Sequence, residues 1–274
     1  MVKKIMIGIV GCGAIGTSLA KAIVNNFTKQ ATLASLYDIN EDKALGLAKK
    51  LRINASILSP SLDYLIERAD LVIEAAAASS CLSIAKRVLG KGRDIIIMSV
   101  GGIVAHINEL RNLAIKKRAR VYIPSGAICG VDGLKGTSQG KIKKIILTTR
   151  KNPKSFKNID YIKQRKIKLD KIKKDTILFS GNAGRAIKFF PQNINVAATL
   201  GIAGIGESRT QVRIIASPKI KRNIHEILIE SDAGRISTRV ENLVHPENPK
   251  TSFLAVLSAV ATLRQILEPI KIGT

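Results

Sequence analysis

The 274-residue chain has no tryptophan, and aromatic residues make up only 4% of it. A surface that stacks the bases of single-stranded nucleic acid needs several aromatic side chains, so this composition argues against such a surface. No run of about 18 or more uncharged apolar residues occurs, which argues against a membrane-spanning helix. Because the first predicted strand begins at Lys4, we also expect no targeting segment ahead of it.

Cysteine is scarce, with Cys12, Cys81 and Cys129 far apart in the sequence and no CxxC pair. Structural zinc sites and disulfide frameworks need closely spaced or numerous cysteines, so we expect no metal site and no disulfides. A protein with isolated cysteines of this kind fits the reducing cytoplasm.

Acidic residues number only 20 against 45 basic ones, which gives a net charge of +25. Much of the excess lies in residues 141–174, where 14 lysines and arginines face only Asp160 and Asp170. Such a charge can attract nucleic acid nonspecifically, yet no zinc-finger, helix-turn-helix or RNP-like motif accompanies it. We interpret the segment as a solvated basic surface without a specific nucleic-acid partner, whose field attracts anionic small molecules.

Near the N-terminus, Gly11, Gly13 and Gly16 separate an apolar β-rich run from a segment with helical spacing. In this position Gly11 permits a tight reversal, Gly13 lets a pyrophosphate approach the backbone, and Gly16 allows the helix to pack closely on the strand. The first helical residues, Ala14 and Ile15, present unpaired N–H groups at the positive end of the helix dipole. A structural glycine turn is the alternative, but the strand–turn–helix context favours a dinucleotide site.

A second predicted strand, ATLASLYDIN, places Asp38 22 residues after Gly16. A carboxylate at this point accepts hydrogen bonds from both ribose hydroxyls of NAD and repels the 2′-phosphate of NADP. Lys43 lies close enough in sequence to weaken that preference. The cofactor prediction is therefore NAD, with NADP left open.

Strands and helices alternate through residues 1–123, which predicts a parallel sheet with right-handed crossovers, an α/β fold of the Rossmann type. The expected strands are 4–10, 33–37, 71–74, 94–98 and 120–123, and the expected helices are 15–25, 41–50, 62–68, 80–89 and 107–117. Ligands bind at the carboxyl ends of such strands. We therefore expect residues 75–79, including Ala76, and residues 99–102 to line the cofactor cleft.

From Pro124 onward the pattern changes to that of a second, α+β domain over residues 124–234, with strands at 142–150, 175–181, 209–217 and 225–233. A helix is expected over 195–205. The apolar tail 251–267 predicts a buried helix that starts near Pro249 and returns to the nucleotide domain, which is completed by about residues 235–274.

Three histidines are candidates for acid–base chemistry. His106 opens a predicted helix and is expected at the surface or as a cap, His245 lies in a loop that could face the cleft, and His225 opens an alternating strand. A structural role is the alternative for each of them. In FFPQNINVAATL, Asn193 or Asn195 caps the following helix or holds a nicotinamide carboxamide, and small residues at 197, 198, 201 and 204 permit close approach.

Five segments, GIVGCGAIG, PSGAICGVDG, FPQNINVAATL, RNIHEILIESDAG and ENPKTS, together resemble the L-aspartate dehydrogenase family along nearly the whole chain. The resemblance implies that Ala127 and Asn195 contact NAD and that His225 is the catalytic histidine, acting as general acid or base. It also implies a homodimer that moves a hydride from L-aspartate to the nicotinamide. The product, iminosuccinate, is hydrolysed to oxaloacetate and ammonia or enters NAD biosynthesis.

The two carboxylates of aspartate need cationic or N–H partners, for which Lys250 and Arg209 are the sequence candidates. Two rival interpretations stay open. One is another two-domain NAD(P) oxidoreductase of the homoserine or dihydrodipicolinate type. The other is an NAD-sensing nucleic-acid-binding protein, supported by the net charge of +25.

Overall fold

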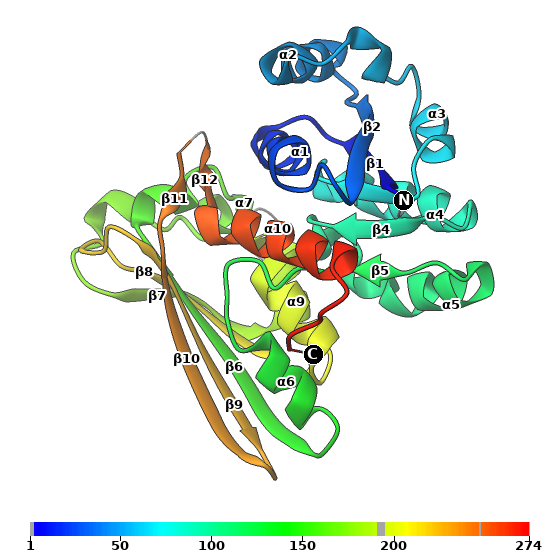
Figure 1. The fold of residues 1–274 in the computed structure, drawn as a ribbon. Coiled ribbons are helices and arrows are strands. Elements are labelled where there is room, and N and C mark those ends of the chain that lie inside the picture. The colour runs from blue at the N-terminus through cyan, green and yellow to red at the C-terminus, as the bar shows by residue number, and fades with distance from the viewer. Residues whose placement is uncertain (1–2, 191–194, 247, 274) are drawn as a thin grey trace. The chain divides into compact units, whose positions relative to one another are not determined.

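A computed structural model describes residues 3–190, 195–246 and 248–273 of the chain. The chain divides into two compact units, the first formed by Met1–Pro124 with Val256–Ile272 and the second by Ser125–Ala255 with the last two residues. Each unit contains a five-stranded sheet, and the C-terminal helix, coloured orange to red in Figure 1, belongs to the first unit from Val256 onward.

The sheet of the first unit is parallel throughout, in the order β2-β1-β3-β4-β5. Its strands are β1 (Ile5–Val10), β2 (Ala31–Tyr37), β3 (Leu71–Glu74), β4 (Asp94–Ile97) and β5 (Val121–Tyr122). Its helices are α1 (Ala14–Asn26), α2 (Glu41–Leu51), α3 (Leu62–Glu67), α4 (Ala78–Gly90) and α5 (Ile107–Lys117). This is the predicted Rossmann-type arrangement, and its elements agree with the sequence prediction to within about two residues.

Buried residues alternate between the two faces of this sheet, so the unit has a core on each side. In β3, Leu71 and Ile73 join the core that includes residues of α1, α2 and the C-terminal helix, whereas Val72 joins the core formed with α3, α4 and α5. Both faces of a parallel sheet are covered in this way because each crossover helix must lie on one of them. The carboxyl ends of the strands are left as the accessible edge.

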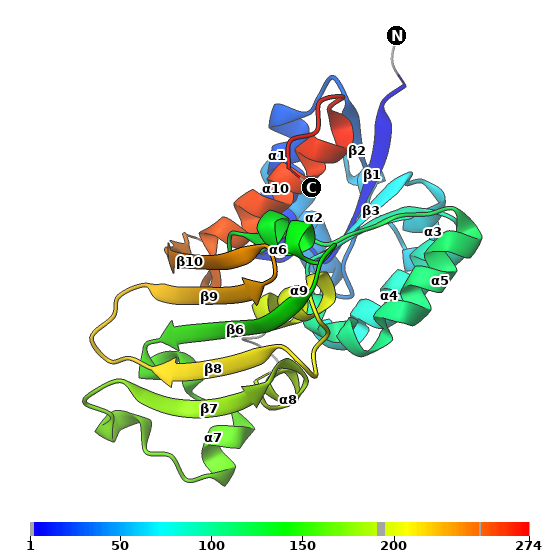
Figure 2. The ribbon, with the colours of Figure 1, turned by 90° about the horizontal axis from the view of Figure 1, so that it is seen from below.

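The sheet of the second unit is mixed, in the order β10-β9-β6-β8-β7, with β6 and β8 parallel and the other neighbours antiparallel (Figure 2). The strands are β6 (Ile142–Lys151), β7 (Thr176–Asn182), β8 (Gln211–Ala216), β9 (Asn223–Ser231) and β10 (Gly234–Asn242). The helices are α6 (Val131–Thr137), α7 (Asp160–Gln164), α8 (Ala183–Phe189) and α9 (Asn195–Ala203). The predicted α+β character is therefore observed.

One face of the second sheet carries the core of the unit. Ile145 and Leu147 of β6 and Ile227 and Ile229 of β9 pack there with buried residues of α8 and α9. Because side chains alternate along a strand, Thr149, Lys151 and His225 lie on this same face. The basic segment 141–174 thus includes a central strand as well as the surface that was expected.

Strand β10 was absent from the sequence prediction, and it changes where the chain leaves the second unit. Its nine residues pair with β9 from Gly234 to Asn242, so these residues belong to the second sheet. The return to the first unit begins at Val256, later than the expected residue 235. The strand is hard to find in the sequence because its side chains are mainly polar and only partly buried.

The C-terminal helix α10 (Phe253–Leu267) starts after a two-stranded ribbon of β11 (Val244–His245) and β12 (Asn248–Ser252), so Pro249 does not open the helix as predicted. Nor is the helix buried all round: its buried stripe is Val256, Ala259 and Leu263, while Leu257 is 48% exposed. Ala259 and Leu263 pack into the core of the first unit, as expected for a returning helix. Among the helices that the structure describes, none is long and apolar enough to span a membrane.

Candidate active site

The turn between β1 and α1 requires glycine at two of its three glycine positions. Gly11 has φ of 96°, and a Cβ atom there would lie 2.5 Å from the carbonyl oxygen of Ala75. A Cβ atom on Gly16 would lie 1.9 Å from the carbonyl oxygen of Gly11. Nothing lies within 4 Å of the corresponding position on Gly13, so the backbone there is open to an approaching ligand.

Asp38 follows β2 with its carboxylate held by backbone amides. Its Oδ2 accepts a hydrogen bond from the Cys12 amide at 2.7 Å, and its Oδ1 accepts one from the Asn40 amide at 2.9 Å. The first bond ties the acid to the glycine turn. Burial and the Asp38 charge raise the pKa of the Cys12 thiol to about 12, so that this thiol stays neutral.

A cavity of about 540 Å³ opens at the carboxyl ends of β1, β2 and β3. Its lining includes Gly11, Gly13, Asp38 and Ala76, together with Ile39, whose side chain is 93% exposed. The remaining lining residues are Val10, Tyr37, Lys43, Leu62, Ala75, Ala77, Ser79, Ser80, Ser83, Ile84 and Arg87. An apolar wall beside a fixed carboxylate suits an adenosine group.

Three predicted cofactor positions, Ala14, Ile15 and Gly16, are absent from that lining, and so are residues 99–102. Ala14 and Ile15 form the first turn of α1, while Gly16 packs against the turn itself. Ser99 is buried and donates a hydrogen bond from its hydroxyl to the Ala76 carbonyl at 2.9 Å.

Glu74, at the end of β3, is fully buried and was not identified from the sequence. Its carboxylate accepts hydrogen bonds from the amides of Ala76 at 2.9 Å and Ser99 at 3.0 Å, and from the Cys81 thiol at 3.3 Å. Burial and the nearby Glu74 raise the pKa of Cys81. The acid therefore holds together the ends of β3 and β4, and of these two the β3 end lines the cavity.

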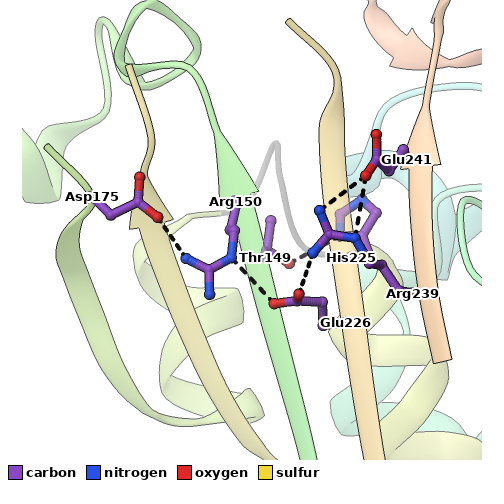
Figure 3. Close-up of polar contacts among 7 residues, drawn as sticks. All are labelled: Thr149, Arg150, Asp175, His225, Glu226, Arg239 and Glu241. Atoms are coloured by element: carbon purple, nitrogen blue, oxygen red, sulfur yellow. Dashed lines mark hydrogen bonds and ion pairs between the residues drawn. The ribbon is translucent and has the colours of Figure 1, made fainter. Parts of the chain in front are cut away.

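In the second unit, His225 lies on β9 directly opposite Thr149 of β6. The threonine Oγ1 and the histidine Nδ1 are 3.0 Å apart and hydrogen-bonded (Figure 3). The ring is 3% exposed, and burial, aided by the charge of Lys151, lowers the pKa of His225 to about 3. The imidazole is consequently neutral at physiological pH, with its Nδ1 engaged by Thr149.

On the other face of the same strands, charged side chains form a ladder across β6, β9 and β10 (Figure 3). Arg150 bridges Asp175 at 2.8 Å and Glu226 at 3.2 Å, Glu226 also pairs with Arg239, and Arg239 contacts Glu241 at 2.9 Å. Each of these pairs is partly exposed and worth little alone. As a network they add to the backbone pairing that places Thr149 opposite His225.

The two second-unit positions predicted to contact NAD differ in their surroundings. Ala127 is buried, and its carbonyl accepts a hydrogen bond from Asn242 Nδ2 at 3.0 Å. Asn195 is exposed at the start of α9, whereas Asn193 lies outside the described residues. The small residues here are used for packing within the unit. Ala197 and Ala198 of α9 are buried, and a Cβ atom on Gly204, directly after the helix, would lie 2.5 Å from Ile145.

The remaining candidates lie elsewhere. His106 is an exposed residue 3.3 Å from Glu109 at the start of α5. His245, expected in a loop, is buried in β11 with its ring edge-to-face to Phe253. Arg209 lines a separate cavity of about 570 Å³ with Lys143 and Lys144 at the start of β6. The other candidate, Lys250, belongs to β12, and its side chain is not among those described.

Comparison with known proteins covers both units. Residues 132–266 match the family model described as aspartate dehydrogenase, C-terminal, and residues 11–124 match that of the homoserine dehydrogenase NAD-binding domain. L-aspartate dehydrogenase of Methanosarcina acetivorans is 46% identical over 98% of this chain and 99% of its own length. The chain belongs to the L-aspartate dehydrogenase family. The protein of the same name from Methanocaldococcus jannaschii is 40% identical over the same shares of the two chains.

Solved structures agree with this membership of the L-aspartate dehydrogenase family. Aspartate dehydrogenase of Thermotoga maritima, at 26% identity, superposes with a TM-score of 0.76 over 99% of this chain and 100% of its own. A homoserine dehydrogenase of Thiobacillus denitrificans, at 15% identity and a TM-score of 0.61, shows a similar fold. The family resemblance, the fold class and the nicotinamide-dinucleotide cofactor predicted from the sequence are thereby confirmed.

Proposed function

We propose that this chain oxidises the amine of L-aspartate with NAD or NADP, giving iminosuccinate and, after hydrolysis, oxaloacetate and ammonia. The observation that carries the proposal is the match to aspartate dehydrogenases across the second unit, where a neutral, buried His225 is positioned by Thr149. The first unit alone supports any dinucleotide enzyme. The homoserine-type family model, for example, matches only residues 11–124.

The residues of the first unit fit a dinucleotide. Gly11 and Gly13, with the first turn of α1 (Ala14, Ile15), would hold the pyrophosphate through backbone N–H groups, and Gly16 lets the helix approach. Asp38 would accept hydrogen bonds from the ribose hydroxyls, and its charge favours NAD over NADP. Ala76 lines the same cavity. For the second unit we propose cofactor contacts at Ala127 and Asn195.

When bound, the dinucleotide supplies the acceptor for the two electrons and the hydrogen that leave the α-carbon of aspartate. We assign proton transfer to His225. Its Nε2 accepts a proton from the substrate ammonium, which leaves the neutral amine that oxidation requires. After that proton has passed to solvent, the neutral ring can accept the proton that the attacking water loses. Thr149 holds the ring through Nδ1, so the ring orientation is fixed before substrate binds.

We propose a homodimer formed through the open face of the second sheet. That face lacks helices in Figure 2 and combines apolar side chains, such as Ile177 at 60% exposed, with the charged ladder described above. Light scattering coupled to gel filtration tests this proposal, because a monomer at micromolar concentration contradicts it. The three free cysteines support our further proposal that the protein is cytoplasmic.

The test of the activity is a spectrophotometric assay of NADH and NADPH formation with L-aspartate, homoserine and a 2-hydroxy acid. Turnover with aspartate, and with oxaloacetate plus ammonia in reverse, is expected. Turnover with homoserine but not aspartate would replace the proposal with the homoserine-type alternative. Retention on duplex DNA at physiological salt, with no dehydrogenase activity, would favour the nucleic-acid-binding alternative. Use of the iminosuccinate in NAD biosynthesis stays a prediction.

A further inference from the structure

A buried lysine lies next to the histidine to which we assign proton transfer. Lys151 ends β6, in the middle of the sheet, and is only 8% exposed. Lysine is one of the residue types least often buried, because removing its ammonium from water is costly. This cost lowers the pKa of Lys151 to about 8. The fold holds this ammonium in place despite the cost.

Strand geometry puts Lys151 on the same side of the sheet as His225. Thr149 is the direct partner of His225, and Lys151 follows it by two residues, so the side chains of Thr149 and Lys151 leave the same face. On the other side of β6, Lys151 is the register partner of Ala216, a residue of the hydrophobic core. Diagonal neighbours on one face of a sheet lie within reach of long side chains, and the charge of Lys151 contributes to the lowered pKa of His225.

The other cations considered for substrate binding do not share this position. Arg150 points to the opposite face and is paired with Asp175 and Glu226 (Figure 3). Arg209 lines the cavity at the start of β6, beside Lys143 and Lys144. Five or six residues of strand separate that end from Thr149, which is roughly 17–20 Å at the usual rise per residue. A carboxylate held by Arg209 would therefore be far from His225.

We propose that Lys151 forms the carboxylate subsite for the dicarboxylate substrate, holding one carboxylate beside His225. The proposal rests on the function proposed above. A carboxylate at this ammonium would form an ion pair with it and so weaken its repulsion of a proton on the imidazole. Proton affinity at His225 would then rise when the substrate binds, so that the same contact would both position the substrate and prepare the proton acceptor.

The test uses Lys151→Met, Lys151→Gln and Lys151→Arg, with Lys143→Met as a matched control. Lys143 is an exposed lysine on the same strand, and its variant should behave as the wild type. Three quantities are measured: KM for aspartate, the inhibition constant of succinate, which is a dicarboxylate without an amine, and the Kd of NADH from its fluorescence. Thermal unfolding identifies any variant that fails to fold.

Loss of a charged hydrogen-bonded contact corresponds to about a 10- to 150-fold weaker interaction. We expect increases of this size in KM and in the succinate inhibition constant for Lys151→Met and Lys151→Gln, partial recovery with Lys151→Arg, and an NADH Kd within about twofold of wild type. Unchanged succinate inhibition in a folded Lys151→Met protein overturns the subsite. So does a parallel loss of NADH binding in all three variants, which would indicate a structural role.

Failure of the proposed function is a different result. In that case the wild-type enzyme shows no turnover with aspartate. The subsite can still be tested, because succinate should then protect the wild type, but not Lys151→Met, against thermal unfolding.

Discussion

The most direct physical consequence of the buried ammonium concerns stability: replacing Lys151 by methionine should make the ligand-free protein more stable. The pKa of this lysine falls from 10.5 to about 8 on folding. Each pKa unit corresponds to about 1.4 kcal/mol, so the buried charge costs about 3 kcal/mol of folding free energy at pH 7. Methionine fills a similar volume without the charge, which removes this penalty.

The sign follows from proton binding. The folded-state pKa lies below the unfolded-state value, so the unfolded chain holds the proton more tightly. The penalty is complete below pH 8 and fades as the pH rises toward 10.5. Lys151→Met should therefore gain about 3 kcal/mol over wild type at pH 7 and progressively less at higher pH.

Urea unfolding of both proteins, followed by far-ultraviolet circular dichroism at pH 7 and pH 10, measures this difference. Lys143→Met serves again as the control and should be neutral at both pH values, because its side chain is exposed. A Lys151→Met protein that is less stable than wild type at pH 7, or a gain that does not shrink at pH 10, would refute the reasoning. Either result would mean that the lysine contributes to folding by contacts that outweigh its desolvation.

Three further predictions concern the residues identified above. His225→Gln should lower kcat by about 10²- to 10⁴-fold with NADH affinity unchanged. Because burial lowers the pKa of His225 to about 3, wild type should also lose about 2 kcal/mol more folding stability than this variant between pH 7 and pH 5. Equal losses in the two proteins would contradict the neutral, buried imidazole. Asp38→Ser should reduce the preference for NAD over NADP in kcat/KM by about tenfold or more, equivalent to one lost charged hydrogen bond, and an unchanged ratio would remove Asp38 from cofactor selection. Gly13→Ala should leave the melting temperature nearly unchanged but weaken NADH binding. Gly16→Ala should instead destabilise the fold, because its Cβ would lie 1.9 Å from a carbonyl oxygen. Equal melting temperatures for the two variants would contradict this distinction.

The sequence predicted the first unit well because its signals are local. The deciding residues lie at the ends of strands and helices: Gly11, Gly16 and Asp38. Each residue type is required by a close backbone contact or a hydrogen bond to a neighbouring turn or strand. Asn40 also caps α2 as its residue type suggests, with Oδ1 accepting from the Asp42 amide at 3.1 Å. Glu74 was missed because a single acid at a strand end gives no indication that two loop amides will converge on it.

The second unit was less predictable because its key relations are long-range. The hydrogen bond between Thr149 and His225 joins residues 76 positions apart, and it depends on the register of β6 against β9, which no short motif encodes. Strand β10 escaped detection for a related reason: it lies at the edge of the sheet and has no continuous buried stripe. The family resemblance could identify His225, but it could not supply the neighbours that determine its protonation.

Lys151 shows how a composition signal can conceal a functional one. Within residues 141–174 it is one of 14 basic residues, and the segment as a whole indicated a solvated surface. The alternation in β6 nevertheless contains the distinguishing signal, because Ile145, Leu147, Thr149 and Lys151 occupy one face and the first two lie in the core. A lysine in register with core residues has to remain buried, since turning it outward would bring its neighbours out with it. The strand therefore holds the ammonium on the face that carries His225, which is where the proposed carboxylate subsite lies.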